Sequence, residues 1–240
     1  MLAEAREVAS CICSNWAKVA LICCQLNINK QLLPYPYPTR LQKCCYRHNA
    51  LRSNNGQLSN GVGFLQDHGG RDFLWACTDG EATSDVILSW HIATSILEAK
   101  LHHHHPLSSS SSDNQIIVAT HLSRYCAYLV NCWPELLPDD DKWSKSLYDA
   151  VTKDSEHGVV KKGVRLGRQL TELKGEEAWS LLAGVWSEMI LYVAPSDNLS
   201  AHSDAIARGG ELITVVWALL MHLGIYKRPR TRPAADANSV

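Results

Sequence analysis

The chain has 240 residues, of which 46% are hydrophobic and 20% are charged, a composition typical of globular rather than disordered proteins. Its formal net charge is −1, which argues against nucleic acid as a partner because no basic field surrounds the molecule. No stretch reaches the roughly 18–20 uninterrupted apolar residues of a membrane span, and the N-terminus does not resemble a secretory signal.

Nine cysteines are present, an odd number with several adjacent in the sequence. This arrangement indicates reduced thiols rather than a disulfide framework. The spacing lacks the two-residue gap of paired zinc ligands, so we predict neither a metal nor a cofactor. The cysteines therefore favour an intracellular, cytosolic location.

Two segments precede the main domain. Within residues 1–40, apolar residues at three- and four-residue steps predict a helix over 3–26. Alternating prolines in Leu33–Pro38 then predict an extended connector. Residues 41–82 are rich in Asn, Gly, Ser and Asp from Ser53 onward, and this composition predicts an irregular segment.

A helical domain is predicted over 83–224. Ser84 is expected to cap a helix that runs to about Lys100, with Val86, Ile87, Trp90, Ala93, Thr94 and Leu97 on its inward face. Four histidines and five serines make residues 102–113 a low-complexity loop. The next helix covers 114–130, with inward residues Ile116, Ile117, Leu122, Cys126 and Leu129.

Charged residues mark the following elements. Asp139–Asp141 lacks the spaced ligands and the glycine of a calcium loop, so the triplet is interpreted as the N-terminus of a helix starting near Trp143. Residues 159–173 form a basic amphipathic helix with Val160, Val164, Gly167 and Leu170 on one side. Such a helix either has a solvated outer face or lies on a membrane. Residues 225–240 are predicted to be a disordered basic tail.

The last two predicted helices are the most apolar. They cover residues 176–193 and 204–224 and are expected to form a hairpin. The first presents Trp179, Leu182, Val185, Trp186, Met189 and Val193 to Leu212, Val215, Val216, Leu219 and Leu223. Since no segment has the alternation of a strand, we predict a mostly α fold, an irregular helical domain with a C-terminal helical hairpin and long loops.

Polar residues within these helices are the candidates for chemistry. Arg208 and Glu211 stand at i, i+3 and are expected to share a helix face and form an ion pair. One interpretation makes Glu211 a general base beside His202 or His222. The other is structural, since Glu211 favours a helix N-terminus and Gly209–Gly210 permits close backbone approach. Glu188 either meets the same cluster or faces solvent.

The motifs of known enzyme classes are missing from the sequence. It contains no His-Glu-x-x-His, Gly-x-Ser-x-Gly, phosphate loop or Cys-x-x-Cys. An enzyme is therefore only the alternative, and it requires a metal- or acid/base-dependent site on His91, His202, Glu211 and His222 that converges in one cavity.

Several short segments stand in the order of a known family pattern. They are Ser14–Leu21, Asn55–Gly61, Trp90–Thr94, Leu122–Tyr125, Val185–Met189, Arg208–Leu212 and Met221–Gly224. Together they resemble the plant domain-of-unknown-function families 594 and 4220, and the resemblance covers about residues 14–224. Arg124 and the His-Ser insert depart from the family pattern. The resemblance implies no catalytic residues, and it implies relatives with membrane-spanning helices ahead of this region, a part that we expect to be missing from this sequence.

The leading hypothesis is a non-catalytic helical interaction or regulatory module with an unidentified protein partner. Its expected surface is the Trp90–His91 helix and the turn from Arg208 to Glu211, with Glu188 and His222 as further contact residues. A weaker alternative is a peripheral membrane binder that uses the 159–173 helix and the basic tail.

Overall fold

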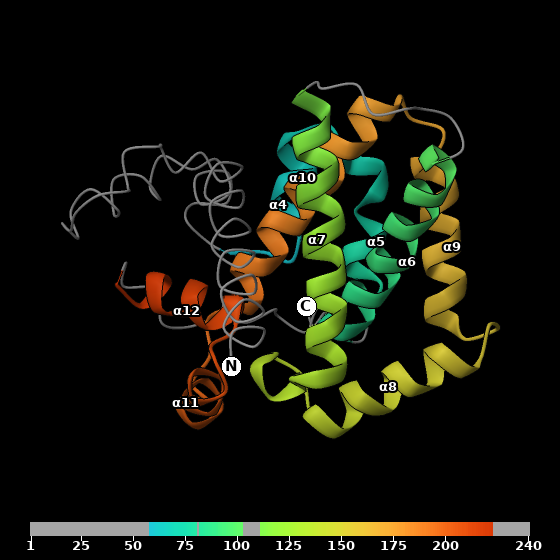
Figure 1. Cartoon of the computed structure of the whole chain (residues 1–240). Coiled ribbons are helices and arrows are strands. Elements are labelled where there is room, and N and C mark those ends of the chain that lie inside the picture. The colour runs from blue at the N-terminus through green and yellow to red at the C-terminus, as the bar shows by residue number, and fades with distance from the viewer. Residues whose placement is uncertain (1–57, 81, 103–110, 223–240) are drawn as a thin grey trace, which may run out of the picture.

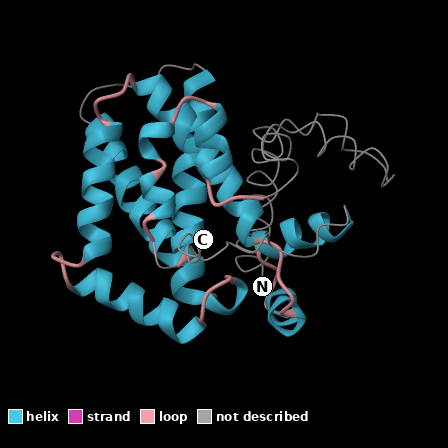
Figure 2. Ribbon diagram, turned by 180° about the vertical axis from the view of Figure 1, so that it is seen from behind, coloured by secondary structure: helices cyan, strands magenta, loops and turns pink. Residues whose placement is uncertain are grey.

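The computed structural model describes residues 58–80, 82–102 and 111–222. Within these ranges the chain forms helices and no strands (Figures 1 and 2), which confirms the predicted mostly α fold. The elements are α4 (Val62–Asp67), η2 (Arg71–Phe73), α5 (Trp75–Thr78), α6 (Thr83–His102), α7 (Ser111–Cys132), η3 (Pro134–Leu136), α8 (Asp141–Lys153), α9 (Gly158–Leu170), α10 (Gly175–Val193), α11 (Leu199–Ala207) and α12 (Leu212–His222). The predicted helix 3–26, the Pro connector, most of the low-complexity loop and the basic tail lie outside the described residues.

Helix α10 is the centre of the core. Every residue from Leu181 to Val193 is buried, because α10 lies against α7 along its length and also contacts α4 and α12. A helix that is apolar on all sides is stable only when it is covered on all sides. Burying each large side chain, such as Trp186 or Met189, contributes about 1.5–3 kcal/mol, so α10 anchors the domain.

Helices α6 and α9 pack closely because α9 carries glycines where it meets α6. A Cβ atom at Gly163 would lie 2.7 Å from Ile92 Cβ, and one at Gly167 would lie 2.9 Å from Ile96 Cδ1. The buried residues of α9 are Val159, Gly163, Leu166, Gly167 and Leu170. The predicted inward face was therefore wrong at Val160 and Val164, which are only half-buried, because glycine contacts are not visible in a pattern of apolar side chains.

The acidic triplet caps two helices. Asp140 accepts a hydrogen bond from the Trp143 backbone N–H at 2.8 Å and caps α8, which confirms the capping interpretation. The Asp139 carboxylate accepts hydrogen bonds from the backbone N–H groups of Thr83 and Ser84 at 3.1 and 2.6 Å. Helix α6 is thus capped by a residue 55 positions away, and not by Ser84 as predicted, since Ser84 lies inside the helix.

The second helix of the predicted hairpin is divided. Gly209 and Gly210 have φ angles of 110° and 84°, a left-handed conformation that ends α11 and turns the chain into α12. Among the described residues, apart from the chain neighbours, no atom lies within 4 Å of a Cβ atom built at either glycine. There they provide the turn and not the close backbone approach of the structural interpretation. The principal partner of α10 is α7 and not α12.

Two further details differ from the prediction. Residues 58–80 contain the short helices α4, η2 and α5, whereas an irregular segment was expected. Ile117, expected inside, is 37% exposed. Of the described thiols, Cys77 and Cys126 are free and buried as expected, whereas Cys132 is free but exposed. Burial raises the pKa of Cys77 and of Cys126 to about 12.

Candidate functional site

Glu211 is held by two tyrosines of α7. The Tyr125 hydroxyl donates a hydrogen bond to Glu211 Oε2 at 3.1 Å and accepts one from the Ile213 backbone N–H at 3.0 Å. The Tyr128 hydroxyl donates to Glu211 Oε1 at 3.0 Å and accepts from Trp133 Nε1 at 2.8 Å. Burial, with Glu211 as the next cause, raises the pKa of Tyr125 well above 10.0. Both phenols therefore stay protonated and fix the start of α12, and neither is a base.

Arg208 does not pair with Glu211. Its guanidinium carbon lies 4.5 Å from the centroid of the Trp133 ring, a cation–π contact, and no ion pair joins Arg208 to Glu211 among the described residues. The predicted i, i+3 pair was wrong because the two residues do not share a helix. Arg208 follows α11, and Glu211 precedes α12.

His202 joins the last two helices. Its Nδ1 shares a 3.1 Å hydrogen bond with Thr214 Oγ1, and its ring stacks on that of Trp217 with centroids 4.2 Å apart. The residue is 1% exposed, so this contact holds α11 against α12. The side chain of His222 lies outside the described residues, and its predicted role stays a prediction.

Trp90 and His91 belong to the interior of the bundle. Trp90 is completely buried and cannot contact a partner in the folded chain, which corrects its prediction as a surface residue. His91 Nδ1 shares a 2.9 Å hydrogen bond with Ser123 Oγ of α7. Burial, followed by the charge of Arg124, lowers the pKa of His91. Its neutral imidazole is thus a link between α6 and α7.

Glu188 anchors α4 to α10. Its carboxylate accepts hydrogen bonds from Ser59 Oγ at 2.6 Å and from the Phe64 backbone N–H at 2.7 Å. Ser59 Oγ in turn accepts from the Gly63 backbone N–H at 2.7 Å. Glu188 is 1% exposed, and burial raises its pKa although the two hydrogen bonds oppose this. The carboxylate therefore caps α4 and is closed to an external partner, which corrects its prediction as a contact residue.

The candidate residues form separate links between helices and not one reacting group. His91 bonds to α7, His202 bonds to α12, and Glu211 bonds to two tyrosines of α7. Throughout the described ranges, no group of three or more His, Cys, Asp or Glu side chains is arranged to hold a metal ion. The arrangement stabilises helix packing, and it offers no nucleophile paired with a base.

The basic helix α9 uses part of its charge within the fold. Arg165 lies 4.4 Å from the centroid of the Trp75 ring, and Lys161 pairs with Glu156 at 2.9 Å. The Nζ atom of Lys162 is buried, and burial lowers its pKa. Among the described residues, none of the helices combines the length and the apolar character that crossing a bilayer demands.

An exposed apolar face on α11 was not predicted. Leu199 and Ile206 are 62% and 60% exposed, and their spacing of seven residues places them on one side of the helix. Figures 1 and 2 show α11 and α12 at one side of the bundle, away from α9. The signal in the sequence is this spacing, and it was missed because the predicted helix began at residue 204, after Leu199.

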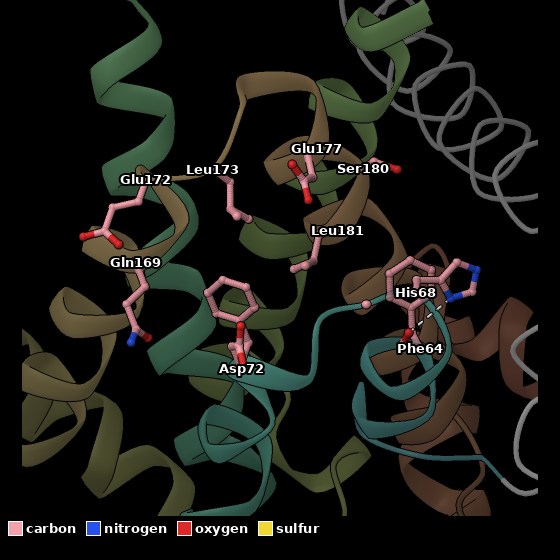
Figure 3. Close-up of a pocket in the computed structure, with 11 residues that line it drawn as sticks. Phe64, His68, Asp72, Gln169, Glu172, Leu173, Glu177, Ser180 and Leu181 are labelled. Atoms are coloured by element: carbon pink, nitrogen blue, oxygen red, sulfur yellow. Dashed lines mark hydrogen bonds between the residues drawn. The ribbon is translucent and has the colours of Figure 1, made fainter.

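A cleft opens where α4 and η2 meet the connection from α9 to α10 (Figure 3). Its volume is about 690 Å³, within the range of about 300–1,000 Å³ that is common for small-molecule sites. The apolar part of its lining comes from Phe64, Phe73, Leu173 and Leu181, and the polar part includes His68, Asp72, Gln169, Glu172, Glu177 and Ser180. No sequence pattern predicts this cleft, because its residues come from two segments, 64–73 and 169–181, that are about 100 positions apart in the chain.

Comparison with known proteins identifies a family for the C-terminal third. No curated protein and no solved structure matches the chain. The matching segment begins at the end of α9 and includes α10, α11 and α12. It therefore contains Glu188, Arg208 and Glu211, which hold α4 and the turn before α12. Residues 171–225 match the model of the family described as Protein of unknown function, DUF594.

Proposed function

We propose that this chain is a non-catalytic helical interaction module, and that it binds a protein partner through the exposed face of α11 and the adjoining Arg208. The observation that carries the proposal is the exposure of Leu199 and Ile206, at 62% and 60%. Two large apolar side chains on one side of a short helix favour burial against another surface.

The opposite side of α11 is already in use, which leaves one face for a partner. Ala201, His202 and Ala205 are buried against the rest of the domain. Asn198 caps the helix by accepting a hydrogen bond from the Ala201 backbone N–H at 3.1 Å. It also donates to the Glu135 backbone carbonyl at 3.2 Å. The exposed face is therefore held in place before binding, which lowers the entropy cost of association.

The charge beside this face indicates the chemistry of the partner. Arg208 is exposed and its guanidinium is positioned by the Trp133 ring. A guanidinium pairs best with a carboxylate through two parallel hydrogen bonds. The partner suited to this face is an amphipathic helix with apolar residues toward Leu199 and Ile206 and a carboxylate toward Arg208.

Proximity labelling in cells tests the proposal, with the wild-type chain and a Leu199→Asp/Ile206→Asp double variant as baits. Because both side chains are exposed, the double variant should fold normally and lose a discrete set of neighbours. Arg208→Ala should reduce labelling of the same proteins. The matched control is Ile117→Asp, which changes an exposed apolar residue on α7 and should keep every neighbour. Identical neighbours for the wild type and the double variant would remove α11 as the binding face.

The setting of the module is part of the same proposal. The resemblance to a plant family with membrane-spanning relatives supports a plant protein that works on the cytosolic side of a membrane. Fractionation of plant cells should then find the α11 partner at a membrane. A partner confined to the secretory lumen would contradict this setting.

A further inference from the structure

We propose that the cleft between α4, η2 and the connection from α9 to α10 binds a small organic cation, a protonated amine or guanidinium carried on an apolar body. This site is separate from the α11 face, since no residue of α11 lines it. Its volume of about 690 Å³ suits a ligand the size of an aromatic or branched aliphatic amine.

The apolar part of the cleft is formed by rigid side chains. The tip of the Phe64 ring lies against Gly184 of α10, where a Cβ atom would overlap it. The His68 ring stacks on the Phe64 ring, with centroids 4.1 Å apart. Figure 3 shows Leu173 and Leu181 turned toward the same space. A ligand with an apolar body would displace water from these surfaces without reorganising them.

The polar groups of the cleft are acceptors. Asp72, Glu172 and Glu177 supply carboxylates, and no lysine or arginine is among the described residues of the lining. Figure 3 shows Glu177 turned inward and Glu172 turned away, so Asp72 and Glu177 are the carboxylates assigned to the cation. A lining with this charge attracts cations and repels carboxylate or phosphate ligands.

One further acceptor points to the same ligand class. Gln169 Oε1 is buried and has no hydrogen-bond partner among the described residues, a cost that a donor from a ligand would remove. His68 Nδ1 lies 3.1 Å from the Phe64 backbone carbonyl oxygen, and since a carbonyl can only accept, Nδ1 donates this hydrogen bond. A metal ion does not fit this site, because no group of three ligands is gathered within the described residues.

The experiment is an NMR titration of the whole chain with two probes of equal shape and opposite charge, phenethylammonium and 3-phenylpropionate. The variants Asp72→Asn and Glu177→Gln keep the side-chain shape and remove one charge each. Asp204→Asn is the matched control, since Asp204 is exposed on α11 and does not line the cleft. Circular dichroism checks that each variant is folded.

We expect saturable shifts with phenethylammonium only, and about tenfold weaker binding for each cleft variant, as loss of one charge-assisted hydrogen bond predicts. Asp204→Asn and the α11 double variant should bind as the wild type does, so this result does not depend on the proposed partner surface. Equal binding of the two probes, binding unaffected by Asp72→Asn and Glu177→Gln, or no saturation at millimolar concentration would each overturn the assignment.

Discussion

Removal of the Glu188 carboxylate is the sharpest test of how α4 is attached to the domain. The carboxylate accepts one hydrogen bond from Ser59 and one from the Phe64 backbone N–H. Glu188→Ala removes both acceptors inside the core, where water does not replace them. Glu188→Gln keeps the shape: its carbonyl can accept from Phe64, and its amide can donate to Ser59, whose hydroxyl has two lone pairs.

The expected magnitude follows from these contacts. A buried N–H left without an acceptor costs about 1–3 kcal/mol, and the lost methylene adds about 0.8 kcal/mol. We therefore expect Glu188→Ala to lower the free energy of unfolding by roughly 2–4 kcal/mol. For a domain of this size, 1 kcal/mol corresponds to about 2–4 °C, so the Tm should fall by about 4–16 °C. Glu188→Gln should change the free energy by less than about 1 kcal/mol.

Urea unfolding followed by circular dichroism measures both variants. An unfolding free energy of Glu188→Ala within about 0.5 kcal/mol of the wild type would show that the two hydrogen bonds do not hold α4. Equal losses for Ala and Gln would show that the charge itself is required.

The stability difference between the wild type and Glu188→Gln should depend on pH, with a defined sign. Burial raises the pKa of Glu188 above its ordinary value of 4.5, so the folded state binds this proton more tightly than the unfolded state does. The stabilisation from protonated Glu188 is complete below pH 4.5 and is lost as the pH rises through the pKa of Glu188 in the folded state. The wild type should therefore lose stability relative to Glu188→Gln across that window, and a constant difference between them would contradict the pKa shift.

Three other predictions concern links between helices. Gly163→Ala should destabilise the domain by about 1–3 kcal/mol, because its Cβ would lie 2.9 Å from the Ser89 carbonyl oxygen. Gly175→Ala is the control, because a Cβ atom built there meets no described atom within 4 Å, and it should stabilise the domain by up to about 1 kcal/mol. Equal changes in Tm for Gly163→Ala and Gly175→Ala would refute close packing of α6 and α9. Tyr125→Phe should cost about 1–3 kcal/mol in urea unfolding because the Ile213 N–H loses its acceptor, and a loss no larger than that of Tyr128→Phe would contradict this role. Because the pKa of His91 is lowered in the folded state, neutral His91 stabilises the fold above about pH 6.5, and this stabilisation is lost as the pH falls toward the folded-state pKa. The urea midpoints of unfolding at about pH 5 and pH 8 should therefore differ less for His91→Gln than for the wild type. An equal difference in both proteins would refute this role of His91.

The sequence by itself determined the longer helices of the bundle. Apolar residues at helical spacing predicted α6, α7 and α10, and six inward residues of α6, among them Trp90 and Leu97, are buried as expected. Asp140 was identified as part of a helix N-terminus because a carboxylate there satisfies the free N–H groups of the first turn. These features depend on neighbours a few residues apart, so a local pattern contains them.

The tertiary structure decided which polar residues meet. Glu188 caps a helix that begins 126 residues earlier, and Glu211 is bound by Tyr125 and Tyr128 of another helix. The pairing of Arg208 with Trp133 likewise depends on the turn at Gly209 and Gly210. Each contact joins segments that are distant in the chain, and helical periodicity contains no information about such pairs. The cleft and the exposed face of α11 arise from the same cause, since both exist only after the helices have packed.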